Sequence, residues 1–253
     1  MRIMMKLNSP FPQLLEYNYN HYLNGFLYNM IGKSNIEIST KLHNEGYLAK
    51  GKPIKPLVFS RLYFDNRKAT KRGLIVEGEG RWFVSSLYEE LLLPFISSTA
   101  QQYKLVVGDV SFLIDEVQIM RKPKFTDDMD FTMLSPTVAP KRIPEQNNRL
   151  KFCHPMENEF YDILKENILR KYKLIYKTDY SGDRPLNFSV TYPEKMDIKK
   201  AACLVRYRSQ NIKCYMFPIT LTGDPKLIEL CYELGIGSYN IQGFGMLELV
   251  ERR

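Results

Sequence analysis

The chain has 253 residues, of which 44% are hydrophobic and 25% are charged, as in globular proteins with one or two domains rather than in disordered chains. Lys and Arg outnumber Asp and Glu by 36 to 28, which gives a formal net charge of +8 and favours a polyanionic partner such as nucleic acid. The four cysteines form no C-x-x-C pair, so neither a zinc ribbon nor a disulfide framework is indicated, and reduced, mostly buried thiols are expected.

No stretch approaches the roughly eighteen apolar residues of a membrane span. The N-terminal residues alternate between charged or polar and apolar positions and lack the apolar run of a signal peptide. We therefore expect a cytoplasmic protein without a membrane partner.

The first predicted elements are a strand and a helix. Residues 2–7 alternate with period two, which is typical of a half-buried strand. A helix is predicted over residues 18–32, because its large apolar side chains fall at helical spacing. A shorter helix is expected in residues 35–43, NIEISTKLH.

The rest of the first half is rich in strands. β-Branched and aromatic residues predict strands at 57–64, 73–79, 81–86, 103–107 and 111–120. Residues 65–72, DNRKATKR, are predicted to form a polar hairpin loop. Residues 86–98 are predicted to be helical in their first part, with Pro94 ending or kinking the helix.

The second half repeats this order of elements. Strands are predicted at 130–138, 186–192, 201–208 and 211–221 and at the C-terminal end. A helix is predicted over 155–173, with Pro155 in its first turn, and a second helix precedes the last strand. The sequence thus predicts an α+β fold of two tandem ferredoxin-like (RRM-like) β-α-β-β-α-β domains, over residues 1–122 and 123–253.

The last helix leads into a glycine-rich segment, GIGSYNIQGFG, and then into a strand. Asp224 is the expected N-cap of this helix, Pro225 its first residue and Gly235 its terminator. A dinucleotide-binding loop needs the reverse order, a strand before the loop and a helix after it. A Rossmann site is therefore excluded.

Glycines lack a Cβ, so exposed backbone N–H groups in such a loop can approach a phosphate chain closely. The candidate RNA-binding positions of the loop are Gly235, Gly237, Ser238, Gly243 and Gly245. The alternative is a turn that only joins helix to strand.

Several segments, taken in order, resemble one known family. They are MRIMMKL, YNHYLNGFLYNMI, LHNEGY, KPLVFSRLYF and the closing LGIGSYNIQGFGMLEL. The chain resembles the repeat-associated mysterious proteins, and within that superfamily the CRISPR endoribonuclease that cuts precursor CRISPR RNA within each repeat. The resemblance covers essentially the whole chain and implies that the glycine-rich loop grips RNA between two domains.

The resemblance also implies the catalytic residues. His43 matches the family's catalytic histidine, Tyr28 matches a tyrosine that joins the active site in several members, and Lys55 matches a lysine before the second strand. Lys52 is the alternative to Lys55. Alone, His43 would more often be a cap or core residue, and Tyr28 a core tyrosine. His21 and His154 are interpreted as helix-face and helix-start residues.

RNA carries its own nucleophile, the 2′-hydroxyl, so cleavage requires a base, stabilisation of the phosphorane and an acid, but no metal. The family resemblance implies a metal-independent endoribonuclease that leaves a 2′,3′-cyclic phosphate and a 5′-hydroxyl, with no cofactor and no metal site. CRISPR repeat RNA is the expected partner, with interference-complex subunits or a second copy of the chain as further candidates. Arg206 and Arg208, alternating on one predicted strand face, are the preferred phosphate contacts.

Two other functions are considered. One is a catalytically silent repeat-RNA binder or a structural subunit of an interference complex, because some relatives keep the fold and lose the histidine. The other is a generic single-strand RNA binder, which is disfavoured because Met246 and Leu249 stand where stacking aromatics would be expected.

Overall fold

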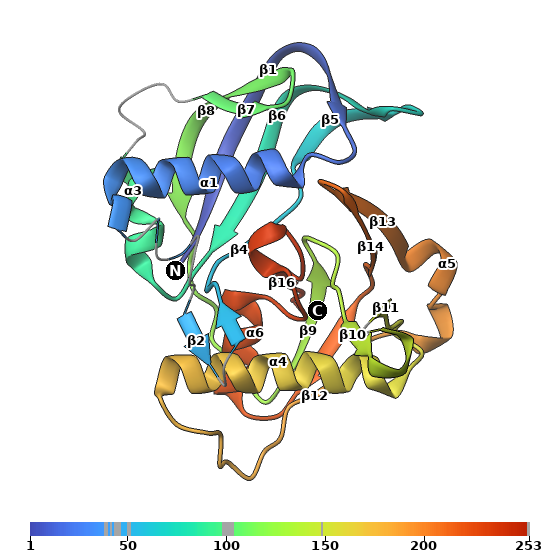
Figure 1. Ribbon diagram of the computed structural model, residues 1–253. Coiled ribbons are helices and arrows are strands. Elements are labelled where there is room, and N and C mark those ends of the chain that lie inside the picture. The colour runs from blue at the N-terminus through green and yellow to red at the C-terminus, as the bar shows by residue number, and fades with distance from the viewer. Residues whose placement is uncertain are drawn as a thin grey trace.

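The computed structural model describes residues 1–37, 40, 42, 47–49, 52–97, 104–147 and 149–251. It contains two main antiparallel sheets, each covered by helices (Figure 1). The predicted α+β class is confirmed.

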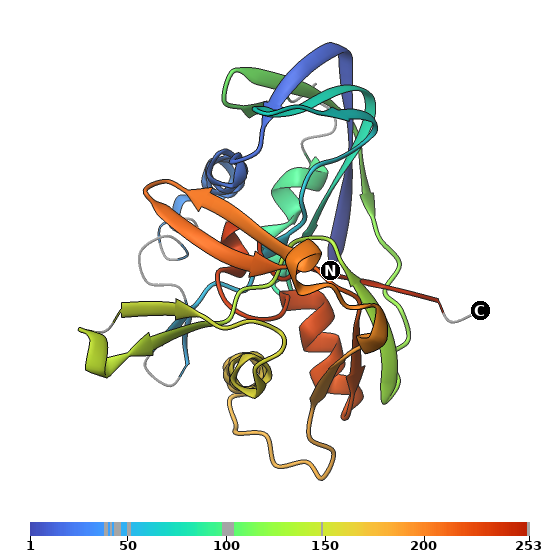
Figure 2. The same ribbon diagram turned by 90° about the vertical axis from the view of Figure 1, so that its right-hand side faces the viewer.

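The first sheet contains β1 (Arg2–Glu16), β4 (Val58–Phe59), β5 (Tyr63–Ala69), β6 (Gly73–Ser85), β7 (Lys104–Val107) and β8 (Val110–Ile119). Its strand order is β7-β8-β1-β6, and both β4 and β5 pair with the remaining edge of β6. The helix α1 (Asn20–Ser34), the 3₁₀ helix η1 (Glu89–Leu91) and the short α3 (Leu93–Ser97) belong to this unit, and α1 crosses one face of the sheet (Figures 1 and 2).

The alternation of β1 explains this packing. Ile3, Met5 and Leu7 point to one face and are buried in the first core, because successive side chains of a strand point to opposite faces. Leu23 and Leu27 of α1 lie in the same core.

The second sheet contains β9 (Asp128–Met133), β12 (Asn187–Val190), β15 (Ile219–Thr222) and β16 (Leu247–Leu249), in the order β12-β15-β9-β16. The helices α4 (Asn158–Tyr176) and α6 (Pro225–Leu234) pack on it through an apolar core. Asp224 caps α6 by accepting a hydrogen bond from the Lys226 N–H, as predicted.

Both sheets follow the ferredoxin-like strand order, with the fourth strand beside the first and the second strand at the opposite edge. The additions are short hairpins and helices: β2 (Tyr47–Ala49) with β3 (Lys52–Ile54), β10 (Pro140–Ile143) with β11 (Arg149–Phe152), β13 (Ala202–Tyr207) with β14 (Gln210–Tyr215), α5 (Ile198–Ala201), η3 (Pro144–Gln146), η4 (Pro193–Lys195) and η5 (Asn240–Gln242). The predicted division after residue 122 falls between β8 and β9 and stays a prediction.

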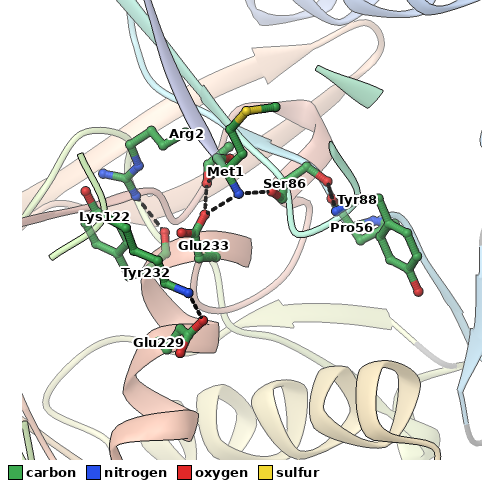
Figure 3. Close-up of polar contacts among 10 residues, drawn as sticks. Met1, Arg2, Pro56, Ser86, Tyr88, Lys122, Glu229, Tyr232 and Glu233 are labelled. Atoms are coloured by element: carbon green, nitrogen blue, oxygen red, sulfur yellow. Dashed lines mark hydrogen bonds and ion pairs between the residues drawn. The ribbon is translucent and has the colours of Figure 1, made fainter. Parts of the chain in front are cut away.

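Polar contacts of the first strand join the two units (Figure 3). The Arg2 guanidinium is 3% exposed, donates to the carbonyls of Tyr232 at 2.6 Å and Leu247 at 2.8 Å, and lies 3.5 Å above the Tyr232 ring. Ser85 of β6 donates to the Glu233 carboxylate at 2.8 Å. The first sheet is thereby fixed to α6 and β16 of the second.

Several predicted boundaries in the first half are wrong. The predicted strand 57–64 is divided into β4 and β5. β5 continues to Ala69 through most of the predicted hairpin loop, because this edge strand is exposed and tolerates polar side chains. The predicted strands 73–79 and 81–86 are one strand, β6. Pro94 lies in the first turn of α3 instead of ending a helix, a position where its missing N–H costs no hydrogen bond.

The second half differs in similar ways. Pro155 precedes α4, which begins three residues later at Asn158. The predicted strand 130–138 ends at Met133. The predicted strand 211–221 is divided into β14 and β15, with Pro218 directly before β15 and unable to donate to a ladder. The β10–β11 hairpin was not predicted.

All four cysteines are free thiols, and Cys153, Cys214 and Cys231 are buried, as predicted. No helix in the part of the chain that the structure describes is long and apolar enough to span a membrane.

Candidate functional site

One face of α1 carries three polar side chains that contact the glycine-rich loop and Lys55. Asn20, Asn24 and Tyr28 are spaced four residues apart, so they lie along one side of the helix. The Tyr28 hydroxyl accepts a hydrogen bond from the Lys55 Nζ, 3.2 Å away. Two of the three candidate catalytic residues, Tyr28 and Lys55, are therefore in contact.

Lys55 is placed by the β2–β3 hairpin, which lies beside α4 (Figure 1). Ile54, the last residue of β3, is buried against Leu174 of α4. The next residue, Lys55, is half-buried between the two units. The side chain of the alternative lysine, Lys52, lies outside the described part of the structure.

Burial changes the acid–base properties of both groups. Removal from water raises the pKa of the Tyr28 phenol, and the nearby Tyr207 adds to this rise. Burial lowers the pKa of the Lys55 amino group. The phenol thus stays protonated at neutral pH and is suited to hydrogen bonding rather than to acting as a base.

His43 lies outside the described residues. Leu42, directly before it, is 1% exposed and buried in the first core, together with the Tyr28 ring that packs against this core. The other two histidines make local contacts. The His21 ring lies 3.9 Å from the Tyr22 ring, and His154 Nδ1 accepts a hydrogen bond from the Met156 N–H just before α4.

A cleft of about 940 Å³ extends from Lys55 across the second unit. Its walls come from β10, α4 and the glycine-rich loop. The charged side chains that line it are Lys55, Lys141, Arg142, Arg170, Lys171, Glu159, Asp162 and Glu166. Lys141 pairs with Glu159. Asn167 lines the cleft as well, and its Oδ1 is buried with no hydrogen-bond partner among the residues that the structure describes.

The glycine-rich loop forms one end of this cleft through residues 238–242. Its glycines are buried, and the N–H groups of Ser238, Gly243 and Gly245 donate to the carbonyls of Val138, Asn240 and Pro136. The expectation of exposed N–H groups at these three positions is wrong, because these groups form hydrogen bonds within the loop and to the segment that follows β9.

Close backbone contacts explain the glycines at the end of the loop. A Cβ on Gly245, which has a φ of +79°, would lie 1.9 Å from the Ile236 carbonyl oxygen. A Cβ on Gly243, with a φ of +84°, would lie 2.4 Å from the Phe59 ring and 2.7 Å from Asn20 Nδ2. Only glycine fits either position.

Arg206 and Arg208 are exposed at the end of the β13–β14 hairpin, which lies beside α1 (Figure 2). The Arg206 N–H donates to the Asn18 side chain at 2.8 Å. Arg208 is not on the strand face with Arg206, since it lies in the turn with a left-handed φ of 54°. The predicted alternation of the two arginines is therefore wrong, although both remain at the same tip.

The sequence interpretation missed the residues that hold the loop. Asn20 donates to the carbonyls of Gln242 and Gly243, Asn24 to that of Ile241, and Lys171 to those of Leu234 and Gly235. The sequence carries a signal for Lys171. This lysine follows Leu164 and Ile168 on the apolar face of α4, where a lysine indicates a buried polar contact.

No group of three or more His, Cys, Asp or Glu side chains among the described residues is arranged to bind a metal ion. Three aspartates, Asp127, Asp128 and Asp130, lie close together in the sequence. The Asp127 carboxylate pairs with Arg184 at 3.5 Å, and the Asp130 carboxylate accepts a hydrogen bond from the Thr220 hydroxyl at 2.6 Å.

Comparison with known proteins assigns both halves of the chain to the same protein family. Residues 14–118 match the family model for the N-terminal part of the CRISPR-associated protein Cas6, and residues 120–249 match that for its C-terminal part. A CRISPR-associated endoribonuclease Cas6 of Methanocaldococcus jannaschii is 28% identical, over 99% of this chain and 93% of that protein. The CRISPR-associated endoribonuclease Cas6 of Pyrococcus furiosus is 26% identical, over 93% of this chain and 83% of its own.

A solved structure described as CRISPR associated protein Cas6 superimposes with a TM-score of 0.79 at 28% identity, covering 99% of both chains. The fold of tandem ferredoxin-like units is therefore shared with a structure of that name over its full length.

Proposed function

We propose a catalytic site and an RNA path for this chain, which belongs to the Cas6 family of CRISPR-associated proteins. The chain is a CRISPR-associated endoribonuclease, like the Cas6 proteins it resembles over almost its whole length. Its substrate is precursor CRISPR RNA, which it cuts within the repeats. The observation that carries the site is the contact of Tyr28 with Lys55 at the edge of the cleft.

The proposed chemistry is attack of the 2′-hydroxyl on the adjacent phosphorus. The oxygen–phosphorus bond to the next nucleotide breaks, and the products carry a 2′,3′-cyclic phosphate and a 5′-hydroxyl. His43 acts as general acid or base. Tyr28 orients the 2′-hydroxyl by a hydrogen bond, and the Lys55 cation stabilises the extra negative charge of the phosphorane. The reaction uses no metal and no cofactor.

The proposed RNA path follows the cleft from Lys55 along α4. Arg142 and Arg170 supply positive charge for phosphates. The glycine-rich loop contributes by shaping the wall of the cleft through residues 238–242.

The β13–β14 hairpin is the second proposed contact with RNA. Its tip carries Arg206 and Arg208, both exposed and next to α1. Contacts of this kind set affinity and salt dependence rather than sequence preference. Two further partners are proposed: a second copy of the chain on the RNA, and subunits of an interference complex. The boundary between the two domains is proposed to lie after residue 122.

The test is incubation of end-labelled repeat RNA with the wild-type protein and with His43→Ala, both in EDTA. The proposal predicts one cleavage site for the wild type, a rate lower by roughly 10²- to 10⁴-fold for His43→Ala, and similar binding by both. Tight binding without cleavage by the wild type would support instead the non-catalytic RNA binder.

A further inference from the structure

A buried lysine connects α4 to the glycine-rich loop. The Lys171 side chain is 2% exposed. Its Nζ donates to the carbonyl oxygens of Leu234 at 3.0 Å and Gly235 at 2.6 Å and to Asn240 Oδ1 at 2.8 Å. These three neutral oxygens match the three N–H bonds of an ammonium group. A lysine this deeply buried is rare, so its contacts point to a specific role.

Asn240 extends the same network across the loop. While its Oδ1 accepts from Lys171, its Nδ2 donates to the Ile236 carbonyl at 3.0 Å and to the Phe244 carbonyl at 2.9 Å. A Cβ on Gly235 or Gly245 would lie 2.9 Å from this Nδ2. The two glycines therefore make room for the amide, and the amide ties the start of the loop to its end.

The opposite side of the loop is held by α1. Asn20 Nδ2 donates to the Gln242 carbonyl at 2.9 Å, and Asn24 Nδ2 donates to the Ile241 carbonyl. Tyr28 is the next residue along the same helix face. The loop thus lies between Lys171 on one side and the helix that carries Tyr28 on the other.

We propose that Lys171 is a positioning residue of the active site, which fixes the glycine-rich loop and, through Asn20 and Asn24, the helix that presents Tyr28 to Lys55 at the edge of the cleft. The proposal rests on the proposed function, since that function makes the cleft catalytic. The three hydrogen bonds of the Lys171 amino group are made to the loop and to the end of α6. We therefore expect it to affect cleavage by holding the loop in place rather than by contacting RNA.

Loss of the amino group leaves three buried acceptors without their donor, and the loop relaxes to find new ones. A shift of about 1 Å at the reacting groups costs roughly a hundredfold in rate. Lys171→Met keeps most of the apolar chain and removes only the donor. Lys226→Met is the matched control, because Lys226 is exposed in the first turn of α6 and lies outside the cleft.

The first arm of the experiment measures hydrogen–deuterium exchange of the protein without RNA. Lys171→Met is expected to speed exchange in peptides covering residues 235–245 and 20–28, while Lys226→Met leaves both at the wild-type rate. Unchanged exchange of the loop in a folded Lys171→Met protein would overturn the proposal. Exchange that increases uniformly over the whole chain would also overturn it, because that result describes a general loss of stability.

The second arm measures single-turnover cleavage of repeat RNA at saturating protein, at a temperature where circular dichroism shows every variant folded. Lys171→Met and Asn24→Ala are each expected to slow cleavage at least tenfold. The double variant is expected to be no slower than the slower single variant, because both act through one loop. Wild-type rates for Lys171→Met, or fully multiplicative effects, would overturn the proposal.

The two proposals fail in different ways. A wild-type protein that binds repeat RNA without cutting it would contradict the proposed function alone. The exchange arm needs no activity, so it still decides whether Lys171 holds the loop and α1.

Discussion

Replacing Lys55 with methionine tests how much the cation contributes to cleavage. The Lys55 Nζ lies 3.2 Å from the Tyr28 hydroxyl and is half-buried at the edge of the cleft. A phosphate oxygen about 4 Å from such a charge gains roughly 1 kcal/mol in water and roughly 4 kcal/mol in a protein environment. A half-buried site lies between these limits, so we expect Lys55→Met to raise the barrier by roughly 2–3 kcal/mol, which is about a hundredfold in rate.

The assay is single-turnover cleavage of repeat RNA at saturating protein, with Lys226→Met as a control for the loss of one positive charge. The pH dependence provides a second readout. Burial lowers the pKa of Lys55, so its cation is present at low pH and is lost as the pH rises through that lowered pKa. The wild-type rate should fall on this alkaline side, and the fall should be absent in Lys55→Met. An unchanged rate at saturation, or a defect confined to RNA affinity, would refute the assignment of Lys55 to the chemical step.

Three further predictions concern the folded protein. The pKa of Lys171 is lowered to about 7 by burial, against about 10.4 in the unfolded chain, so the unfolded state binds more protons between these values. The wild type should therefore gain stability over Lys171→Met as the pH rises. In urea titrations, the difference between their free energies of unfolding should increase by about 2 kcal/mol from pH 7 to pH 9. A difference that does not change with pH would contradict the lowered pKa of the buried Lys171. Arg2→Met should lower the free energy of unfolding by about 3 kcal/mol, because it removes two buried hydrogen bonds and a cation–π contact. This loss of stability should far exceed that of the control Lys6→Met, since the Lys6 partner, Glu116, is exposed. Equal losses of stability in the two variants would contradict the role of Arg2. Gly245→Ala should destabilise the protein by at least about 2 kcal/mol in the same titrations, because its Cβ would meet a carbonyl oxygen, whereas Gly25→Ala, in open space on α1, should leave stability unchanged or raise it slightly.

The order of the main elements could be predicted from the sequence because it depends on local periodicity. The apolar alternation of β1 and the apolar stripe of α6, with its Asp224 cap, both persist in the fold. The errors arose where tertiary contacts overrule local signals. β5 continues through polar residues because its pairing with β6 provides the hydrogen bonds that define a strand, and a polar segment read alone indicates a loop.

The candidate site depended on a different signal, the family resemblance. It assigned Tyr28 and Lys55 to the active site, and the structure places these two side chains in contact. The expectation of exposed N–H groups was wrong at Ser238, Gly243 and Gly245, because sequence alone does not show which N–H groups the protein uses itself. The partners of the loop were missed, since Asn20 and Lys171 lie more than sixty residues from the carbonyls they contact, and no local pattern joins them.

Replacement of the ribose at the cleavage site by 2′-deoxyribose tests the central claim most directly, because it removes the nucleophile and leaves the rest of the RNA intact. The account predicts that the wild-type protein, in EDTA, binds this RNA as tightly as the unmodified repeat and does not cut it. Cleavage of the deoxy-substituted RNA at the same site would contradict attack by the 2′-hydroxyl, and with it the roles proposed for His43, Tyr28 and Lys55.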